Sequence, residues 1–161
     1  MEKRYAESAA MSEKALGLNS NDYNVWNNLI AAYEWLNEAE KIDRAREKMQ
    51  QLLEQAVRVQ PHDALAQALL AVLYAGKKRR TESLAKLQTA RALAPNDSQV
   101  LENEAIAYEE LGERSQAIKC IGEAMKNGLS PEEVKTEPSL RPVIADPEFQ
   151  PQLVASGSVS K

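Results

Sequence analysis

The chain contains very little of what disulfide-stabilised, metal-binding or sheet-based proteins need. Its 161 residues include one cysteine, one histidine, one phenylalanine and three threonines, whereas alanine, leucine and glutamate are abundant. Cys120 alone cannot form an internal disulfide, and one cysteine with one histidine cannot supply a Cys/His metal set. Because β-branched residues are scarce and helix formers dominate, the composition favours helices over sheets. We expect an all-α protein with no metal site and no cofactor.

Long apolar runs and a strong charge of either sign are also missing. The longest apolar run covers residues 68–75, far short of the roughly 20 residues that cross a bilayer, and the first ten residues lack the apolar core of a signal peptide. The net charge is −4, which disfavours nucleic acid or an anionic membrane as the partner. We expect a cytoplasmic location without membrane insertion, with room for an anchor upstream in a longer parent protein.

The sequence offers little for catalysis. His62 stands in a stretch typical of a turn, and Cys120 falls where a helix of a packed pair would bury its thiol. Neither a Ser-His-Asp motif nor a glycine-rich phosphate loop is present. The carboxylate pairs at 109–110 and 132–133 are typical of solvated helix faces. We therefore expect a protein that is not an enzyme.

Apolar residues recur at a fixed interval along the chain, which predicts a repeat array. Residues 64–97 and 98–131 form two units of equal length, and residues 23–63 carry a similar pattern with seven extra residues. The aligned pairs are Ala71 with Ala105, Tyr74 with Tyr108, Leu84 with Ile118, Leu87 with Ile121, and Ala90 with Ala124. Small and large side chains at fixed offsets suit helical hairpins that stack and share one core.

These units resemble tetratricopeptide repeats (TPR). The second unit matches the family pattern at Leu70, Ala71, Tyr74, Leu87, Ala90 and Pro95, and the third at Leu101, Ala105, Tyr108, Gly112, Ala117, Ile121 and Ala124. Three residues depart from it, Gln67 and Glu104 at large apolar sites and Leu129 at the proline site. The resemblance covers residues 23–131 and implies a right-handed superhelix of antiparallel helix hairpins.

The end of the chain carries signals for a short helical cap. Ser130-Pro131 followed by Glu133 is a strong helix start, and Pro138 and Pro142 restrict any helix between them to a turn or two. Residues 123–153 resemble the segment that closes TPR arrays in bacterial multidomain signalling proteins. The matching residues are Gly128, Val134, Pro138, Leu140, Val143, Asp146, Pro147 and Phe149, and Ile144 and Leu153 complete the expected apolar cover.

We predict six segments. They are the second helix of an incomplete repeat at 1–22, a repeat with an extended hairpin at 23–63, two repeats at 64–97 and 98–131, a helical cap at 132–153 and a disordered tail at 154–161. The turn of the extended hairpin is expected near residues 37–41.

The resemblance also implies a concave groove, lined by the first helix of each repeat, that binds a protein or peptide. The positions carried over are Asn24, Asn27, Asn28, Ala31, Leu65, Ala68, Leu69, Val72, Gln99, Glu102, Asn103 and Ile106. They predict an amide-rich end, an apolar centre around Leu69 and a mildly acidic end. No Lys or Arg stands among them, which disfavours a clamp for a peptide's C-terminal carboxylate. The alternative is that Leu65, Leu69 and Val72 are covered by the array itself or by a second copy.

The run Lys77-Lys78-Arg79-Arg80 is the sharpest charge feature. It permits contact with a phosphate or an acidic partner, but a soluble turn partly paired with acids such as Glu110 or Glu113 is the favoured interpretation, since one turn offers few phosphate contacts.

We expect a non-catalytic interaction module, the C-terminal part of a larger bacterial signalling or regulatory protein. One alternative is a scaffold that forms homodimers through the incomplete N-terminal repeat. The other is an accessory domain that acts in cis on an enzyme encoded upstream.

Overall fold

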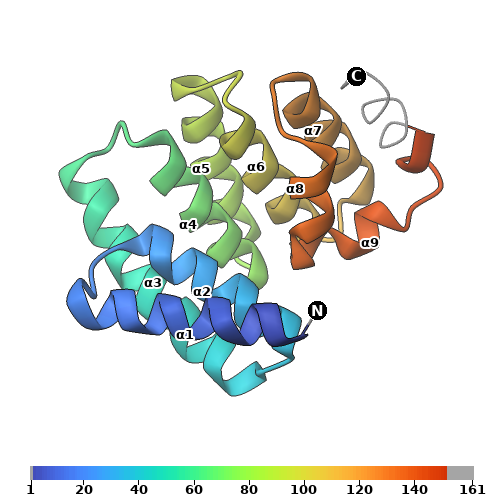
Figure 1. The fold of residues 1–161 in the computed structure, drawn as a ribbon. Helices are drawn as coiled ribbons and strands as arrows, with labels where there is room; N and C mark the ends of the chain where they lie inside the picture. Colours follow the sequence, from blue (N-terminus) through green and yellow to red (C-terminus); the bar gives the residue numbers. More distant parts are fainter. Residues whose placement is uncertain (1, 152–161) are drawn as a thin grey trace. The chain divides into compact units, whose positions relative to one another are not determined.

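The computed structural model describes residues 2–151, and this part of the chain contains helices and no strand (Figure 1). The all-α fold expected from the composition is therefore confirmed. None of these helices combines the length and apolar character that a bilayer-spanning helix needs. The chain divides after Arg58 into two compact units. The predicted tail at 154–161 and Leu153 of the predicted cap lie outside the described residues.

The first unit is built from α1 (Glu2–Leu18), α2 (Tyr23–Leu36) and α3 (Ala39–Val59), the last of which ends at the division. Helix α2 begins where the Asp22 carboxylate accepts hydrogen bonds from the backbone N–H groups of Asn24 and Val25, at 3.0 and 3.3 Å, a side-chain cap for otherwise unpaired donors. It ends at Leu36 and is followed by the C-cap residue Asn37, whose φ of 57° lies in the left-handed region. The hairpin turn therefore lies at the start of the range predicted for it.

Helix α1 packs against α2. Ala9 and Leu16 are buried, and the Tyr5 ring stacks on Trp35 with 4.8 Å between ring centroids. Helix α3 is 21 residues long, whereas the corresponding helices of the later pairs have 14 and 13. Helix α3 is therefore seven residues longer than α5, whereas α2, with 14 residues, is close in length to α4, with 13.

The second unit contains two further helix pairs, α4 (Ala64–Gly76) with α5 (Arg80–Leu93) and α6 (Ser98–Glu110) with α7 (Arg114–Lys126). The partners of each pair pack together, and α4 also packs against α6. Asp63 and Asp97 cap α4 and α6 through their side chains, and each of these helices begins at the first residue of a sequence unit. The interval found in the sequence is therefore the spacing of the helix pairs.

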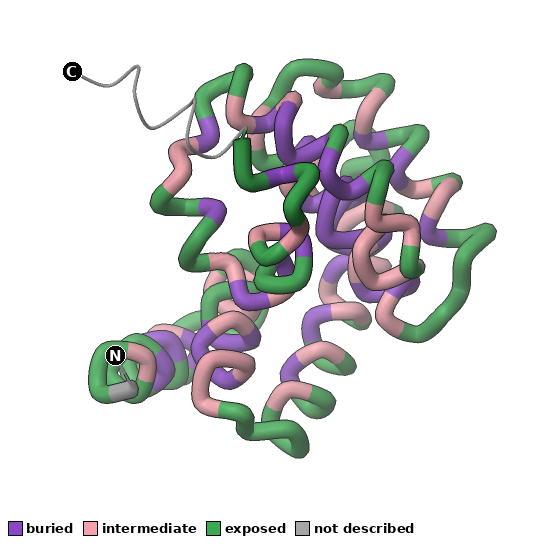
Figure 2. Tube along the Cα trace, turned by 90° about the vertical axis from the view of Figure 1, so that its right-hand side faces the viewer, coloured by how far each residue is buried: buried purple, intermediate pink, exposed green. Residues whose placement is uncertain are grey.

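The alanines of the repeat pattern lie at close contacts between these helices. Ala71 and Ala75 of α4 cluster with Leu87 and Ala107, while Ala68 clusters with Ala90 and Val100. Ala90 and Ala124 have no exposed surface, as expected for small residues that let helix backbones approach. Figure 2 shows buried stretches alternating with exposed ones along the helices, the pattern of helices with one apolar face.

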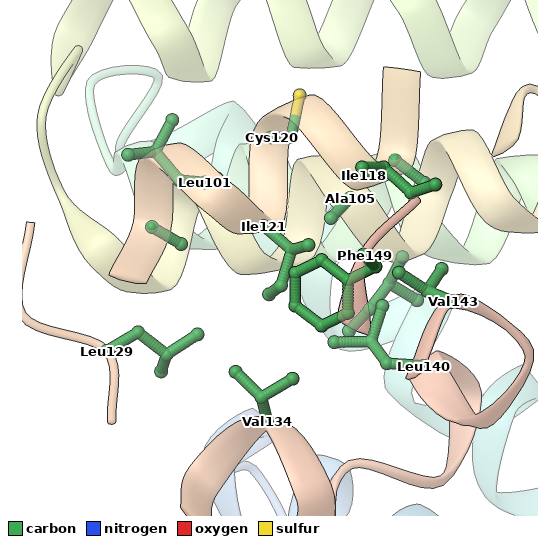
Figure 3. Close-up of a cluster of buried hydrophobic side chains, with 13 residues drawn as sticks. Leu101, Ala105, Ile118, Cys120, Ile121, Leu129, Val134, Leu140, Val143 and Phe149 are labelled. Atoms are coloured by element: carbon green, nitrogen blue, oxygen red, sulfur yellow. The ribbon is translucent and has the colours of Figure 1, made fainter. Parts of the chain in front are cut away.

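A short cap follows α7, made of α8 (Pro131–Thr136), the 3-10 helix η1 (Pro138–Leu140) and α9 (Arg141–Ile144). Ser130 and Glu133 form the predicted capping box. Val134, Leu140, Val143 and Phe149 are fully buried, and Figure 3 shows the Phe149 ring beside Ile121, Leu140 and Val143. The cap therefore covers the apolar face of the last helix pair, as predicted.

Candidate functional site

The partner-binding positions predicted on α2 share one side of that helix. Asn24, Asn27 and Asn28 are exposed and Ala31 is half-buried. Spacings of three, four and seven residues place them on a common face, opposite the apolar residues of α2. Because each amide both donates and accepts hydrogen bonds, this row of side chains can bond an extended peptide backbone.

The positions predicted in the second unit divide between surface and interior. Gln99 is exposed, and Leu65, Val72 and Glu102 are half-buried. Four positions are buried, with at most 8 % of their surface exposed: Ala68, Leu69, Asn103 and Ile106.

The burial of these four residues corrects the predicted groove. Leu69, expected to anchor a partner, is 3 % exposed, so the alternative that the protein itself covers it applies. Asn103 donates from its side chain to the Gln99 carbonyl at 2.8 Å, within its own helix. The apolar centre of the groove is therefore reduced to Leu65 and Val72.

Glu102 is the acidic member of the predicted set. Burial, followed by the negative charges of Glu137 and Glu133, raises its pKa to about 7. Its carboxyl group is therefore protonated to a greater extent near neutral pH than an ordinary glutamate, and it offers a cationic partner less negative charge.

A pocket of about 400 Å³ opens within the first unit, between α1, α2 and α3. Its lining residues are Glu13 and Leu16 from α1, Trp26, Leu29 and Tyr33 from α2, and Lys41, Arg44 and Ala45 from α3. Apolar and aromatic side chains thus supply most of the lining, while the charged groups come from the two outer helices.

Tyr33 provides the polar group of the pocket floor. Its hydroxyl donates to Glu13 Oε1 at 2.6 Å, and the Lys41 ammonium lies 5.3 Å from the centre of its ring. Burial and then the hydrogen bond to Glu13 raise the pKa of Tyr33 to about 12. The hydroxyl is therefore neutral at physiological pH and remains a donor.

This pocket was not predicted from the sequence, although one signal for it was available. Arg80, the first residue of α5, corresponds to Arg46 at the repeat interval, so residues 39–45 are the seven that lengthen α3. Lys41, Arg44 and Ala45 all lie within those seven residues. The insertion therefore supplies one wall of the pocket.

The basic turn is paired within the protein. Lys78 Nζ donates to the Glu110 carbonyl oxygen, and Arg80 lies 2.9 Å from Glu113. Arg79 lies 2.8 Å from Glu82 and covers the Tyr74 ring at 4.3 Å. These contacts support the favoured interpretation of a soluble turn tied to neighbouring acids.

A buried glutamate and two half-buried charges join α5, α6 and α7. Arg91 Nη2 donates to Glu123 Oε2 at 2.5 Å, and Arg91 Nε lies 3.2 Å from Glu104 Oε2 without hydrogen-bond geometry. Burial raises the pKa of Glu104 despite the opposing effect of Arg91. Glu104 occupies a leucine position of the repeat pattern, so Arg91 compensates a charge placed in the core.

The residues that could carry other chemistry are poorly suited to it. Burial and the nearby Glu104 charge raise the pKa of the Cys120 thiol to about 12, which keeps it protonated and weakly nucleophilic. His62 is exposed in the turn before α4. Across residues 2–151, no group of three His, Cys, Asp or Glu side chains is arranged to hold a metal ion.

No protein-family model matches the chain, and no curated protein matches it either.

Proposed function

We propose that the chain is a non-catalytic protein-interaction module of the TPR type, which binds an extended segment of a partner on the asparagine face of α2. This face consists of Asn24, Asn27 and Asn28, and its exposure is the observation that carries the proposal. Hydrogen bonds from side-chain amides to a peptide backbone give affinity without requiring a particular partner sequence.

The repeated helix pairs support the TPR assignment. Helices α4 and α6 each follow a capping aspartate and begin one repeat interval apart, and Ala90 and Ala124 occupy equivalent fully buried positions. A stack of such pairs presents its first helices as a recognition surface. We place the module in the cytoplasmic, C-terminal part of a larger bacterial signalling or regulatory protein.

Peptide display tests the proposed face. Peptides selected from a random library against the whole chain should bind more weakly to Asn27→Ala/Asn28→Ala, by roughly three- to thirtyfold for the loss of one or two hydrogen bonds. The matched control is Gln51→Ala/Gln55→Ala, which removes two exposed amides from α3 and should leave affinity unchanged.

Melting temperature separates binding from folding, because removal of exposed amides should hardly change it. Equal affinity of the wild type and the asparagine variant, or an equal loss in the glutamine control, would refute the asparagine face as the binding site.

Self-association is a second candidate, favoured by the outer surface of α1. Met11 and Leu18 are 73 % and 87 % exposed and lie seven residues apart, on one side of the helix. Sedimentation of the whole chain should then show a dimer that Met11→Glu/Leu18→Glu dissociates. A monomer at all accessible concentrations would eliminate this function.

A further inference from the structure

The geometry points to a ligand site that is independent of the asparagine face: we propose that the pocket between α1, α2 and α3 binds a small aryl- or alkyl-carboxylic acid. The apolar body of the ligand lies among Leu16, Trp26 and Leu29, and its carboxylate lies at the α3 side of the mouth, against Lys41 and Arg44.

The size and lining of the pocket suit such a molecule. A volume of about 400 Å³ falls within the range of small-molecule sites, which are mostly apolar with a few polar groups that orient the ligand. Leu16 and Leu29 are buried at 7 % and 3 % exposure. The Trp26 indole N–H donates to the Ser20 carbonyl at 2.9 Å, so this ring is held in place before a ligand arrives.

The charges at the pocket select for an anion. Its lining holds two cations, Lys41 and Arg44, and one carboxylate, Glu13. Glu13 already accepts the Tyr33 hydrogen bond and belongs to α1, whereas both cations belong to α3. A ligand carboxylate is therefore attracted to the α3 side.

Lys41 and Arg44 are available for exchange with a ligand. Lys41 Nζ lies 3.5 Å from Glu38 Oε1, and these two side chains are 44 % and 45 % exposed. The Arg44 guanidinium lies 3.9 Å from a Glu40 carboxylate whose side chain is 94 % exposed. Exposed ion pairs of this kind contribute little to stability. A ligand carboxylate beside the apolar wall can therefore take the place of Glu38 and Glu40 at small cost in free energy.

The position of the two cations is specific to this helix pair. Both belong to the seven residues by which α3 exceeds α5 in length. Lys41 lies over the Tyr33 ring, and the Arg44 charge acts on the Tyr33 hydroxyl, where it opposes the rise in pKa. The insertion therefore brings positive charge to an apolar floor.

The test compares 3-phenylpropanoate with 3-phenylpropanamide on the whole chain. Binding is followed by NMR through the Trp26 indole N–H, which lines the pocket, with the Trp35 indole as reference. We expect a dissociation constant for the acid on the order of 0.1–1 mM and roughly tenfold weaker binding of the amide.

Three variants assign the binding to the pocket. Lys41→Gln/Arg44→Gln should lower the affinity for the acid to that for the amide. Lys48→Gln/Arg58→Gln, which removes two cations elsewhere on α3, should change neither affinity. Ala45→Leu fills the pocket and should weaken acid and amide alike.

The proposal is overturned if the Trp26 resonance does not move with up to ~10 mM acid, or if acid and amide bind equally well. It is also overturned if the Lys48/Arg58 control loses as much affinity as the Lys41/Arg44 variant. Circular dichroism confirms that each variant is folded, and the two charge variants decide the matter if Ala45→Leu is not.

Discussion

Arg91→Met tests whether a half-buried cation compensates the glutamate in the core of the second unit. The Arg91 side chain is 30 % exposed and that of Glu104 only 11 %, so water can replace little of what Glu104 loses. Removal of one partner from a buried pair leaves the other charge without compensation, which typically costs about 3–5 kcal/mol.

Protonation of Glu104 sets a ceiling on that cost. The ordinary pKa of a glutamate carboxyl is 4.5. Protonating Glu104 therefore costs about 4 kcal/mol at about pH 7.5, but under ~1 kcal/mol at about pH 5. With the partial exposure of Arg91 taken into account, we expect the variant to lose about 2–3 kcal/mol at about pH 7.5 and less than ~1 kcal/mol at about pH 5.

The sign of the pH dependence follows from the raised pKa of Glu104. Between the ordinary and the raised pKa the folded protein binds more protons than the unfolded chain, so its stability falls as the pH rises. Removal of Arg91 raises this pKa further and steepens the fall. Below the ordinary pKa both states are protonated and the effect disappears.

Urea unfolding followed by circular dichroism measures the effect. Both tryptophans, Trp26 and Trp35, belong to the first unit, so their fluorescence serves as an internal reference for that unit. Lys126→Met, which removes an exposed cation from α7, is the control for charge.

The double variant Arg91→Met/Glu104→Leu removes both charges. It should be at least as stable as the wild type, because leucine suits position 104 and no uncompensated charge remains in the core. A loss below ~0.5 kcal/mol in Arg91→Met, or an equal loss at both pH values, would refute the compensation.

Four further substitutions test the packing of the second unit and the carboxyl group of Glu102. Phe149→Ala empties a fully buried site in the cap and should cost about 3–5 kcal/mol in urea unfolding; a loss under ~1 kcal/mol would mean that the cap does not depend on this ring. Ala90→Leu and Ala124→Leu enlarge side chains at contacts with no exposed surface and should each cost about 1–3 kcal/mol of stability. An unchanged melting temperature would show that these contacts can accommodate a larger side chain. Glu102→Gln should stabilise the protein above about pH 7 by up to ~3 kcal/mol, because the raised folded-state pKa of Glu102 makes its ionisation unfavourable there. The variant should also lose less stability than the wild type between about pH 4.5 and 7. If the dependence of stability on pH is unaltered, Glu102 is not its cause.

Much of the fold could be predicted from local features of the sequence. The aspartates before α4 and α6 and the Ser130 capping box fix helix starts through bonds that span three residues or fewer. The repeat interval predicted the register of the pairs α4/α5 and α6/α7, including the buried Ala90 and Ala124. Such signals are readable because they depend on neighbours along the chain.

The candidate sites were predicted less well. The asparagine face on α2 is exposed as expected, since polar residues at helical spacing need only one solvent-facing side. The exposure of Leu69 was mispredicted, because an apolar residue on a first helix suits a groove or a core equally well. The pocket was missed because Glu13, Trp26 and Arg44 come from three different helices.

Local sequence signals were enough to predict a helical chain, the start of α8 and the burial of Ala90 and Ala124. The packing of the helices decides instead the length of α3, the burial of Leu69 and the contacts of Arg91 with Glu104 and Glu123. Helix propensity and capping act over one or two turns, so a single segment records them. Burial and charge pairing depend on which segments pack together, and that is set by the stacking of helices distant along the chain.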